Sequence, residues 1–257
     1  MRVAIVTGAA QGIGRRTAEV LGEAGYTLLL LDMQSCDATL AAVRETGAEA
    51  EELIGDITDE ALIARAISLI MERWARVDVL VNNAGISFIA PAETVEAAAF
   101  RRVLEVNLVA PFVLSRAFGS IMLAQREGSI VNVASIAGLV GVSDRTAYNA
   151  SKHGLIGLTR TLAGEWGGHG IRVNAVCPRW VKTEMDVADQ AGGGYTDDDI
   201  IARVPMARFA TPDDIARAIL FLADPAQSGF INGQALAIDG GWTSDGSWQS
   251  LRMRKRS

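Results

Sequence analysis

The stretch Thr7-Gly8-Ala9-Ala10-Gln11-Gly12-Ile13-Gly14 joins two segments of different hydrophobic pattern. An apolar run from Val3 to Thr7 precedes it, and a segment of helical periodicity from Gly12 to Ala24 follows it, which predicts a strand, a glycine-rich turn and a helix. Glycines allow backbone conformations that other residues avoid, and they let a pyrophosphate approach the N-terminus of the helix. The spacing Gly-x-x-x-Gly-x-Gly differs from the usual dinucleotide motif, and an ordinary tight turn is the alternative. A P-loop is excluded, because no Gly-Lys-Ser/Thr follows.

The composition is typical of a globular α/β protein. The chain has 257 residues, of which 49% are hydrophobic, so its length suits one large domain or two small ones. A net charge of −6 argues against nucleic acid or an anionic membrane as the main partner. The two cysteines, Cys36 and Cys177, indicate neither a disulfide framework nor a metal site, and they predict a cytoplasmic protein.

The N-terminus begins with a charge and an apolar run, as a signal peptide does. The run is short, however, and glycine-rich sequence follows it in place of a cleavage site, so a buried strand is predicted. No apolar stretch approaches the roughly 18 residues needed to cross a bilayer, and no membrane span is expected.

A carboxylate at the end of the second strand predicts the cofactor preference. Thr27 to Leu31 forms a second apolar run, and Asp32 ends it. A carboxylate there accepts hydrogen bonds from the adenosine ribose and repels a 2′-phosphate. Arg15 and Arg16 lie on the first helix, where a solvated face is the expected role. The pattern therefore favours NAD over NADP.

Two further strand ends carry polar residues. A helix at about 37–46 and a strand at 49–54 lead to Asp56, which could contact the adenine amino group or cap the next helix, at about 59–74. The strand 77–81 then ends in Asn82-Asn83-Ala84-Gly85. Such residues commonly make a turn, but at the carboxyl edge of a parallel sheet they lie where open α/β folds bind ligands.

Tyr148 and Lys152 are four residues apart at the start of a predicted helix that runs to Trp166, so they share one face. A free phenol loses its proton near pH 10, and a neighbouring ammonium favours the phenolate. The pair could therefore act as a general acid or base near working pH. The alternative is a helix flank with a snorkelling lysine.

Together these motifs resemble the short-chain dehydrogenase/reductase family. The resemblance covers residues 2–241 and is carried by the glycine turn, Asp56, Asn82-Asn83-Ala84-Gly85, Asn107, Ser135 and Tyr148-x-x-x-Lys152. It implies a single Rossmann-type domain with a doubly wound parallel sheet of about seven strands, helices on both faces, a nicotinamide cofactor and hydride transfer at a carbonyl or secondary alcohol. It also implies a homotetramer, since the edge with the last strand, 234–238, packs on another subunit in the family.

The resemblance assigns roles to four residues. Tyr148 as phenolate takes the alcohol proton, Ser135 hydrogen-bonds the substrate oxygen, Lys152 lowers the phenol pKa and binds the nicotinamide ribose, and Asn107 holds a water that connects Lys152 to solvent. From the residues alone, Asn107 inside the predicted helix 97–124, interrupted near 109–111, more simply satisfies a backbone group, and Ser135 at a strand end is turn material. His153 and His169 are expected to be structural or solvated.

Tyr148 and Lys152 are also predicted to contact the cofactor. The remaining predicted contacts are Gly8, Gln11, Gly12, Ile13, Gly14, Asp32, Asp56, Ile57, Asn83, Ala84, Gly85, Pro178, Val181 and Thr183.

One loop departs from the family pattern. Pro178-Arg179 stands where the family usually has Pro-Gly. If that position requires φ > 0, Arg179 is strained there or the loop takes another course. Arg179 is expected to be solvated, with an anionic substrate group as its alternative partner.

The C-terminal third contains irregular segments. We expect residues 1–242 to form the dehydrogenase domain, with 184–206 as a substrate lid and 243–257 as an extension. A surface insertion is the alternative for the lid. In the extension the basic run 252–256 is expected to fray, with Trp248 and Leu251 as possible anchors on a neighbouring subunit.

The leading prediction is an NAD-dependent oxidoreductase that interconverts a secondary alcohol and a ketone. A 3-oxoacyl-thioester reductase is the runner-up, and a non-catalytic NAD-binding regulatory protein is the alternative from another class. Apolar residues near the expected substrate pocket hint at a hydrophobic or cyclic alcohol; they are Ile86, Phe88, Ile89, Leu139, Val140 and Val142.

Overall fold

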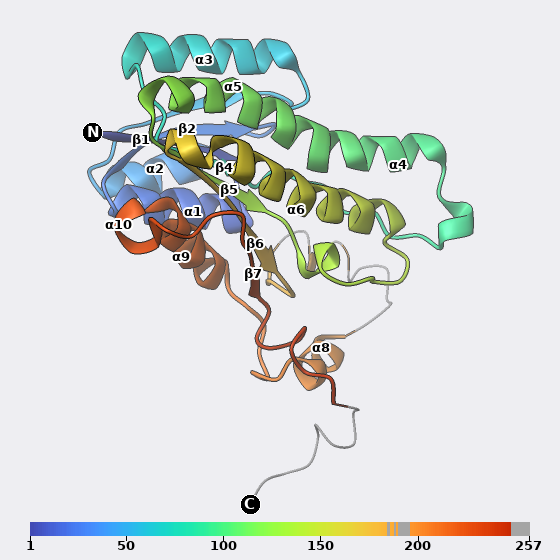
Figure 1. Ribbon diagram of the computed structural model, residues 1–257. Coiled ribbons are helices and arrows are strands. Elements are labelled where there is room, and N and C mark those ends of the chain that lie inside the picture. Colours follow the sequence, from blue (N-terminus) through green and yellow to red (C-terminus); the bar gives the residue numbers. More distant parts are fainter. Residues whose placement is uncertain (184–185, 188, 190–195, 248–257) are drawn as a thin grey trace, which may run out of the picture.

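A single seven-stranded parallel sheet forms the centre of the computed structural model, which describes residues 1–183, 186–187, 189 and 196–247 (Figure 1). The strand order is β3-β2-β1-β4-β5-β6-β7. The strands are β1 (Arg2–Thr7), β2 (Tyr26–Asp32), β3 (Ala50–Ile54), β4 (Val79–Asn82), β5 (Gly128–Val133), β6 (Ile171–Pro178) and β7 (Ala235–Ile238). The order reverses between β1 and β4, which is the switch point where α/β sheets bind ligands. The predicted Rossmann-type fold is confirmed.

Helices cover both faces of this sheet (Figure 1). One layer contains α1 (Gly12–Glu23), α2 (Asp37–Glu45), α9 (Pro212–Ala223) and α10 (Pro225–Ser228). The other contains α3 (Glu60–Arg73), α4 (Ala97–Leu104), α5 (Ala110–Gln125) and α6 (Thr146–Trp166). Each layer packs its apolar side chains on one face of the sheet, so the central strands are buried on both sides and read as continuous apolar runs.

The predicted long helix around residues 97–124 is interrupted earlier than expected. A π-helical segment, Glu105–Val109, separates α4 from α5, and Pro111 lies in the first turn of α5, where a proline is tolerated. The π-helical segment contains Asn107, whose side chain leaves the helix for backbone partners elsewhere.

The run Ala97–Gln125 corrects the expectation that no apolar stretch approaches the length needed to cross a bilayer. By length and composition alone this run is long and apolar enough to cross a membrane, although half of its most apolar stretch is buried inside the protein. A core helix of a soluble domain also meets these criteria of length and composition. Here α5 packs on β4 and β5, which accounts for its apolar face.

The C-terminal part places a short helix beyond the carboxyl ends of the strands (Figure 1). Helix α8 (Asp197–Arg203) begins with a capping box formed by Thr196 and Asp199. Helix α9 begins with another, formed by Thr211 and Asp214. The rest of the predicted lid is described only at Asp186, Val187, Asp189 and 204–206. In the C-terminal extension, the structure does not describe Trp248, Leu251 or the basic run 252–256.

Candidate active site

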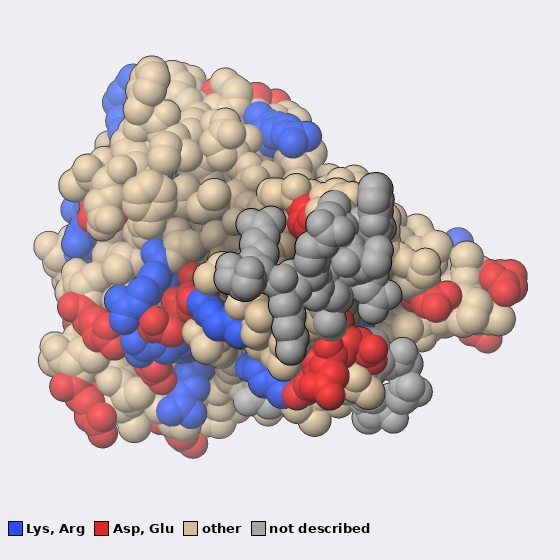
Figure 2. Space-filling model, turned by 90° about the horizontal axis from the view of Figure 1, so that it is seen from below, with Lys and Arg blue, Asp and Glu red and all other residues tan. Residues whose placement is uncertain are grey.

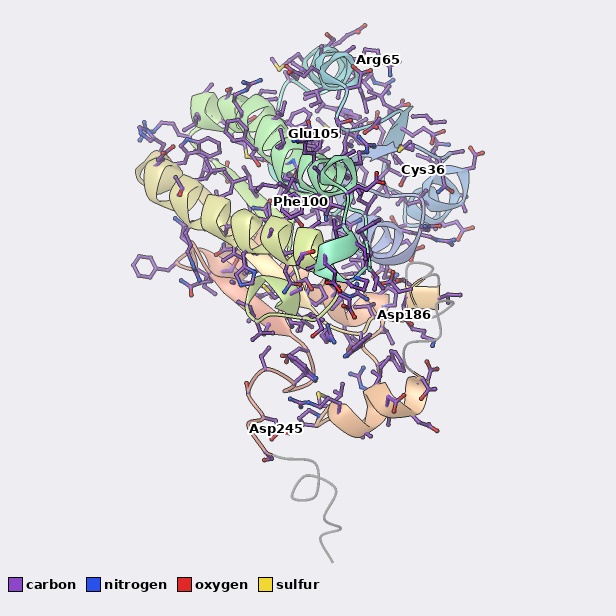
Figure 3. The ribbon with its side chains drawn as sticks, turned by 90° about the vertical axis from the view of Figure 1, so that its right-hand side faces the viewer. Cys36, Arg65, Phe100, Glu105, Asp186 and Asp245 are labelled. Carbon is purple, nitrogen blue, oxygen red and sulfur yellow. The ribbon has the colours of Figure 1, made fainter. Side chains whose placement is uncertain are left out.

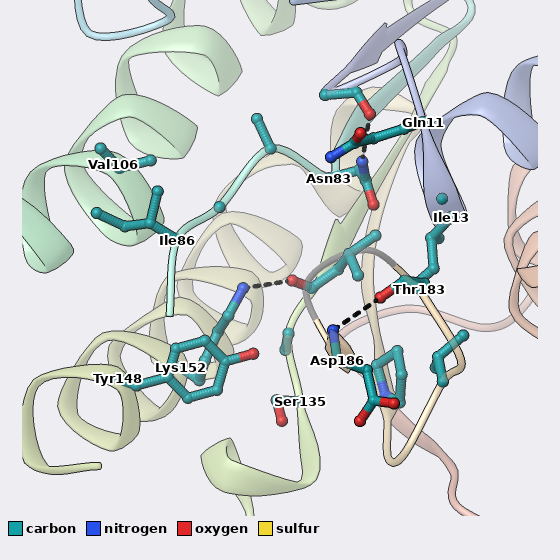
Figure 4. Close-up of a pocket in the computed structure, with 18 of the residues that line it drawn as sticks. Gln11, Ile13, Asn83, Ile86, Val106, Ser135, Tyr148, Lys152, Thr183 and Asp186 are labelled. Carbon is teal, nitrogen blue, oxygen red and sulfur yellow. Dashed lines mark hydrogen bonds between the residues drawn. The ribbon is translucent and has the colours of Figure 1, made fainter. Parts of the chain in front are cut away.

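A cavity of about 380 Å³ opens at the carboxyl ends of the strands. It extends from the glycine turn after β1 to the first turns of α6 (Figure 4). Sixteen of the predicted site residues line it: Gly8, Gln11, Gly12, Ile13, Asp32, Asp56, Ile57, Asn83, Ala84, Gly85, Ser135, Tyr148, Lys152, Pro178, Val181 and Thr183. Gly14 and Asn107 are not among the described lining residues.

The glycine turn is built by close backbone approaches. Gly8 has φ +66°, and a Cβ there would lie 2.9 Å from the Ala84 Cα. A Cβ on Gly14 would lie 1.9 Å from the Gly8 carbonyl oxygen, so Gly14 allows α1 to pack against the turn and does not itself face the cavity. The Asn83 amide donates to the carbonyls of Thr7 (2.9 Å) and Gly8 (3.0 Å), which ties the ends of β1 and β4 together.

The N-terminus of α1 faces the cavity and suits a pyrophosphate. Gly12, with φ +55°, and Ile13 begin the helix and line the cavity. Within the described residues, the Gln11 side chain makes no capping bond, so the first N–H groups of the helix remain available to an anion. The predicted phosphate cradle therefore fits a dinucleotide.

Asp32 is held by the backbone at the end of the cavity that also contains the glycine turn. Its Oδ2 accepts from the Ala10 N–H and its Oδ1 from the Gln34 N–H, both at 2.9 Å. The carboxylate is therefore fixed in position before any ligand binds. This is the placement expected of a group that accepts hydrogen bonds from ribose hydroxyls.

Asp56 lines the same end but is not a helix cap. Its Oδ1 accepts from the Thr58 N–H at 2.9 Å, and its Oδ2 accepts from Arg102 at 2.8 Å. Although burial opposes it, these bonds lower the pKa of Asp56. Asp59 caps α3 instead, so the capping alternative for Asp56 is wrong, and the adenine contact stays a prediction.

Tyr148, Ser135 and Lys152 meet at the other end of the cavity (Figure 4). Ser135 follows β5, and its hydroxyl accepts from the Ala137 N–H at 3.1 Å, so the turn role and the site role coincide. Burial raises the pKa of Tyr148, while a hydrogen bond with Ser135 and the charges of Arg145 and Arg179 lower it. The net pKa shift is upward.

Lys152 lies beside the phenol but is bonded elsewhere. Its Nζ donates to the Val133 carbonyl at 2.8 Å and lies 5.6 Å from the centre of the Tyr148 ring. Burial lowers the pKa of Lys152 to about 8. Burial of the phenol outweighs the favourable charges around it, so the pKa of Tyr148 is raised, and its lowering by Lys152 stays a prediction.

Asn107 is fully buried and holds backbone in place. Its Oδ1 accepts from the Ile86 N–H and its Nδ2 donates to the Ile86 carbonyl, both at 2.9 Å. Nδ2 also donates to Ser151 (3.2 Å), whose hydroxyl donates to the Tyr148 carbonyl (2.7 Å). The simpler alternative, a satisfied backbone group, is thus observed, and the water-holding role stays a prediction.

The loop after β6 takes another course than the family pattern suggests. The positive φ falls on Trp180 (+47°), not on Arg179. The Arg179 guanidinium stacks 3.7 Å above the Trp180 ring and lies 5.0 Å from the Trp242 ring. Arg179 is half-buried and lines the cavity, so the expectation of a solvated side chain is wrong, and the anionic substrate partner stays the alternative prediction.

Three charged side chains at the Tyr148 end of the cavity were not predicted from the sequence. Arg145, Asp186 and Asp189 all line the cavity. Of the apolar residues expected near the substrate, only Ile86 is among the described residues that line the cavity. The others are not part of the described lining: Phe88, Ile89, Leu139, Val140 and Val142. No local motif marks the charged residues, because they converge from distant parts of the chain.

The remaining titratable candidates lie away from the site. His153 and His169 are exposed, as expected. Both cysteines are free and buried, and burial raises the pKa of Cys36 to about 12 and that of Cys177 to about 11. On the face viewed in Figure 2, acidic and basic side chains are interspersed, with no separate basic patch visible outside the grey atoms.

Comparisons with known proteins agree with this geometry. A family model described as enoyl-(acyl carrier protein) reductase matches residues 8–243. The D-threitol dehydrogenase of Mycolicibacterium smegmatis is 38% identical over 94% of this chain and 93% of its own length. The structure of an NAD⁺-bound xylitol dehydrogenase matches with a TM-score of 0.87 and 34% identity, over 93% of this chain and 98% of that one. Actinorhodin polyketide ketoreductase with NADPH matches with a TM-score of 0.90 and 34% identity, over 95% and 98%.

Proposed function

The chain belongs to the short-chain dehydrogenase/reductase family, and from this premise we propose that it interconverts a secondary alcohol and a ketone with NAD, with Tyr148 as the proton-transfer group. It is an oxidoreductase that acts on CH–OH groups and ketones with a nicotinamide cofactor. The single observation that supports the assignment of Tyr148 is the meeting of its phenol with Ser135 in the cavity that also contains Asp32 and the N-terminus of α1.

The residues along the cavity have different proposed roles. Ser135 orients the substrate oxygen, and the Tyr148 hydroxyl gives its proton to that oxygen in reduction or takes one in oxidation. A raised pKa keeps the phenol protonated, which suits proton donation to a ketone. Lys152 lies one turn away to hold the ribose. The nicotinamide, when bound, supplies or accepts the hydride.

NAD is proposed over NADP because a carboxylate repels a 2′-phosphate. Asp32 is fixed by two backbone bonds, and Arg102, the cation at the same end, is paired with Asp56. Of four similar solved structures with a bound nicotinamide cofactor, one carries NAD⁺ and three carry NADP or NADPH. The preference therefore rests on the residues of this chain.

The test is a screen of purified protein with secondary alcohols and the corresponding ketones, with NAD(H) and NADP(H), followed by the absorbance of the reduced cofactor. Turnover with NAD at higher kcat/KM than with NADP is expected. Turnover of no alcohol or ketone with either cofactor would contradict the proposed reaction.

A 3-oxoacyl-thioester reductase is the second candidate. The description of the matching family model, an acyl-carrier-protein reductase, favours it. Acetoacetyl-CoA as substrate distinguishes the two candidates: a kcat/KM above that of every simple ketone, with NADPH preferred, supports the thioester reductase.

The assembly is proposed to be a cytoplasmic homotetramer with residues 1–242 as its domain. β7 pairs with β6 and has no further strand beyond it in the described sheet. Near this edge the Phe230 side chain is fully exposed and Leu236 is 38% exposed, which suits burial against a second copy. Light scattering on the purified protein measures the mass of the assembly.

A further inference from the structure

Asp186 is a buried carboxylate on the wall of the substrate end of the cavity. Its side chain is 7% exposed, and its backbone N–H donates to Thr183 Oγ1 at 3.4 Å. Figure 3 places it at the carboxyl end of the sheet, between the body of the domain and α8. In the close-up the carboxylate is directed toward the side of the cavity that holds Ser135 and Tyr148 (Figure 4).

One oxygen of this carboxylate lacks a hydrogen-bond donor. Oδ2 of Asp186 is buried without a hydrogen-bond partner among the described residues. The Lys182 Nζ lies 3.7 Å from it, too far for a hydrogen bond, and donates instead to both oxygens of Asp197, at 2.7 and 2.8 Å. A buried acceptor in this state is destabilising. Because Asp186 lines the cavity, a turn of its carboxylate toward the cavity would bring this oxygen to a donor on a bound molecule and relieve the cost.

A second polar group lies on the same wall. Arg145 donates to Asp189 Oδ2 and to the Ser87 hydroxyl, both at 2.9 Å, and Ser87 donates to Asp189 Oδ2 at 3.2 Å. The side chains of Arg145 and Asp189 are 12% and 17% exposed, and the guanidinium lies 5.9 Å from the Tyr148 ring centre. This wall is therefore polar and held in place before a substrate binds.

The charges on the wall favour a neutral substrate with several hydroxyl groups. The cations Arg145 and Arg179 balance the anions Asp186 and Asp189 in formal charge, and the positive charge of Lys152 at this end is bonded to the Val133 carbonyl. An ionised carboxylate is a pure acceptor, so Asp186 suits an O–H donor and repels a carboxylate on the substrate. A purely apolar alcohol would leave the Asp186 oxygen buried and unsatisfied.

We propose that the substrate is a polyol, whose reacting secondary alcohol carries neighbouring hydroxyl groups, and that Asp186 determines this specificity by accepting a hydrogen bond from one of them. The inference rests on the proposed function of the same site.

The test compares kcat/KM of the full-length protein for xylitol and galactitol with that for 2-hexanol, cyclohexanol and gluconate, with NAD and NADP. The same comparison is made for Asp186→Asn, which keeps the shape but loses the charge. Asp198→Asn is the matched control, because Asp198 is an exposed carboxylate on α8. Thermal unfolding of each variant establishes that it is folded.

We expect the wild-type protein to prefer at least one of the two polyols over 2-hexanol, cyclohexanol and gluconate. In Asp186→Asn, kcat/KM for that polyol is expected to fall roughly 10- to 100-fold, mainly through KM, while kcat/KM for 2-hexanol changes less than about twofold. Asp198→Asn is expected to match the wild type.

Three results would overturn the inference and leave the proposed function intact. The first is a higher wild-type kcat/KM for 2-hexanol or cyclohexanol than for the polyols, and the second is a higher wild-type kcat/KM for gluconate. The third is the same ratio of kcat/KM for the polyol to that for 2-hexanol in Asp186→Asn and in the wild type. If Asp186→Asn does not fold, the wild-type preference alone decides. Absence of turnover for every alcohol with both cofactors overturns the proposed function and the inference together.

Discussion

The ammonium of Lys152 donates a hydrogen bond to the carbonyl of Val133, at 2.8 Å, and so ties the first turns of α6 to the end of β5. Ser135 follows two residues after that carbonyl, and Tyr148 lies one turn before Lys152 on α6. The bond therefore fixes the distance between the two elements that carry the proton-transfer group and its hydroxyl partner. It also leaves Lys152 buried with a pKa lowered to about 8.

Burial of Lys152 predicts a pH dependence of stability. Because its pKa is about 8 in the folded protein and 10.5 ordinarily, the unfolded chain binds more protons between these pH values. The contribution of Lys152 to the free energy of unfolding should then rise with pH across this window, by up to about 3 kcal/mol. The raised pKa values of the buried Cys36 and Cys177 thiols act in the opposite direction, so the difference between the wild type and a variant without Lys152 isolates the contribution of the lysine. The variant Lys152→Met has no ammonium to titrate, so its free energy of unfolding should lack this contribution. Urea unfolding at pH 8 and pH 10.5 measures it, and parallel pH curves for the two proteins would contradict it.

Removal of the Tyr148 hydroxyl should abolish turnover. Tyr148→Phe keeps the ring but loses the group that transfers the proton, and kcat should fall by about a thousandfold. NAD binding, measured by fluorescence titration, should stay within about twofold of the wild type. His153→Ala changes an exposed neighbour on the same helix and serves as the control. Residual activity above about a tenth of the wild type would remove Tyr148 as the acid–base group.

Asp32→Ala should shift the cofactor preference toward NADP. The change removes the negative charge at the ribose end, so the ratio of kcat/KM with NAD to that with NADP should fall at least about tenfold, about 1.4 kcal/mol. Asp37→Ala, an exposed carboxylate at the start of α2, is the control. Steady-state kinetics with both cofactors measure the ratio. An unchanged ratio in Asp32→Ala contradicts the role of this carboxylate.

Gly14→Ala should destabilise the protein. The added Cβ would lie 1.9 Å from the Gly8 carbonyl oxygen and 2.5 Å from the Asn83 amide, so α1 must shift away from the turn. We expect a loss of about 1–3 kcal/mol, seen as a lower Tm. Gly164→Ala is the matched control, because a Cβ at this exposed position on α6 meets no atom within 4 Å. It should stabilise by up to about 1 kcal/mol. Equal Tm values for the two variants would contradict the packing argument.

The order of elements could be predicted because it depends on local patterns. Apolar runs such as Val3 to Thr7 favour buried strands, and the glycine spacing at Gly8 and Gly12 favours a tight turn into a helix. The cavity residues that follow strand ends, such as Asp32 and Asn83, could be placed because parallel strands end at one edge of a sheet.

The amino-acid sequence by itself determined the strand and helix pattern, the glycine turn and the spacing of Tyr148 and Lys152, because each depends on residues close together in the chain. Only the tertiary structure decided the pKa shifts of these two side chains and the polar wall beside them. Ser87 and Asp189 reach Arg145 from 58 and 44 residues away, so no spacing in the sequence indicates their contact. Burial, the dominant cause of both pKa shifts, likewise exists only once α6 has packed on the sheet.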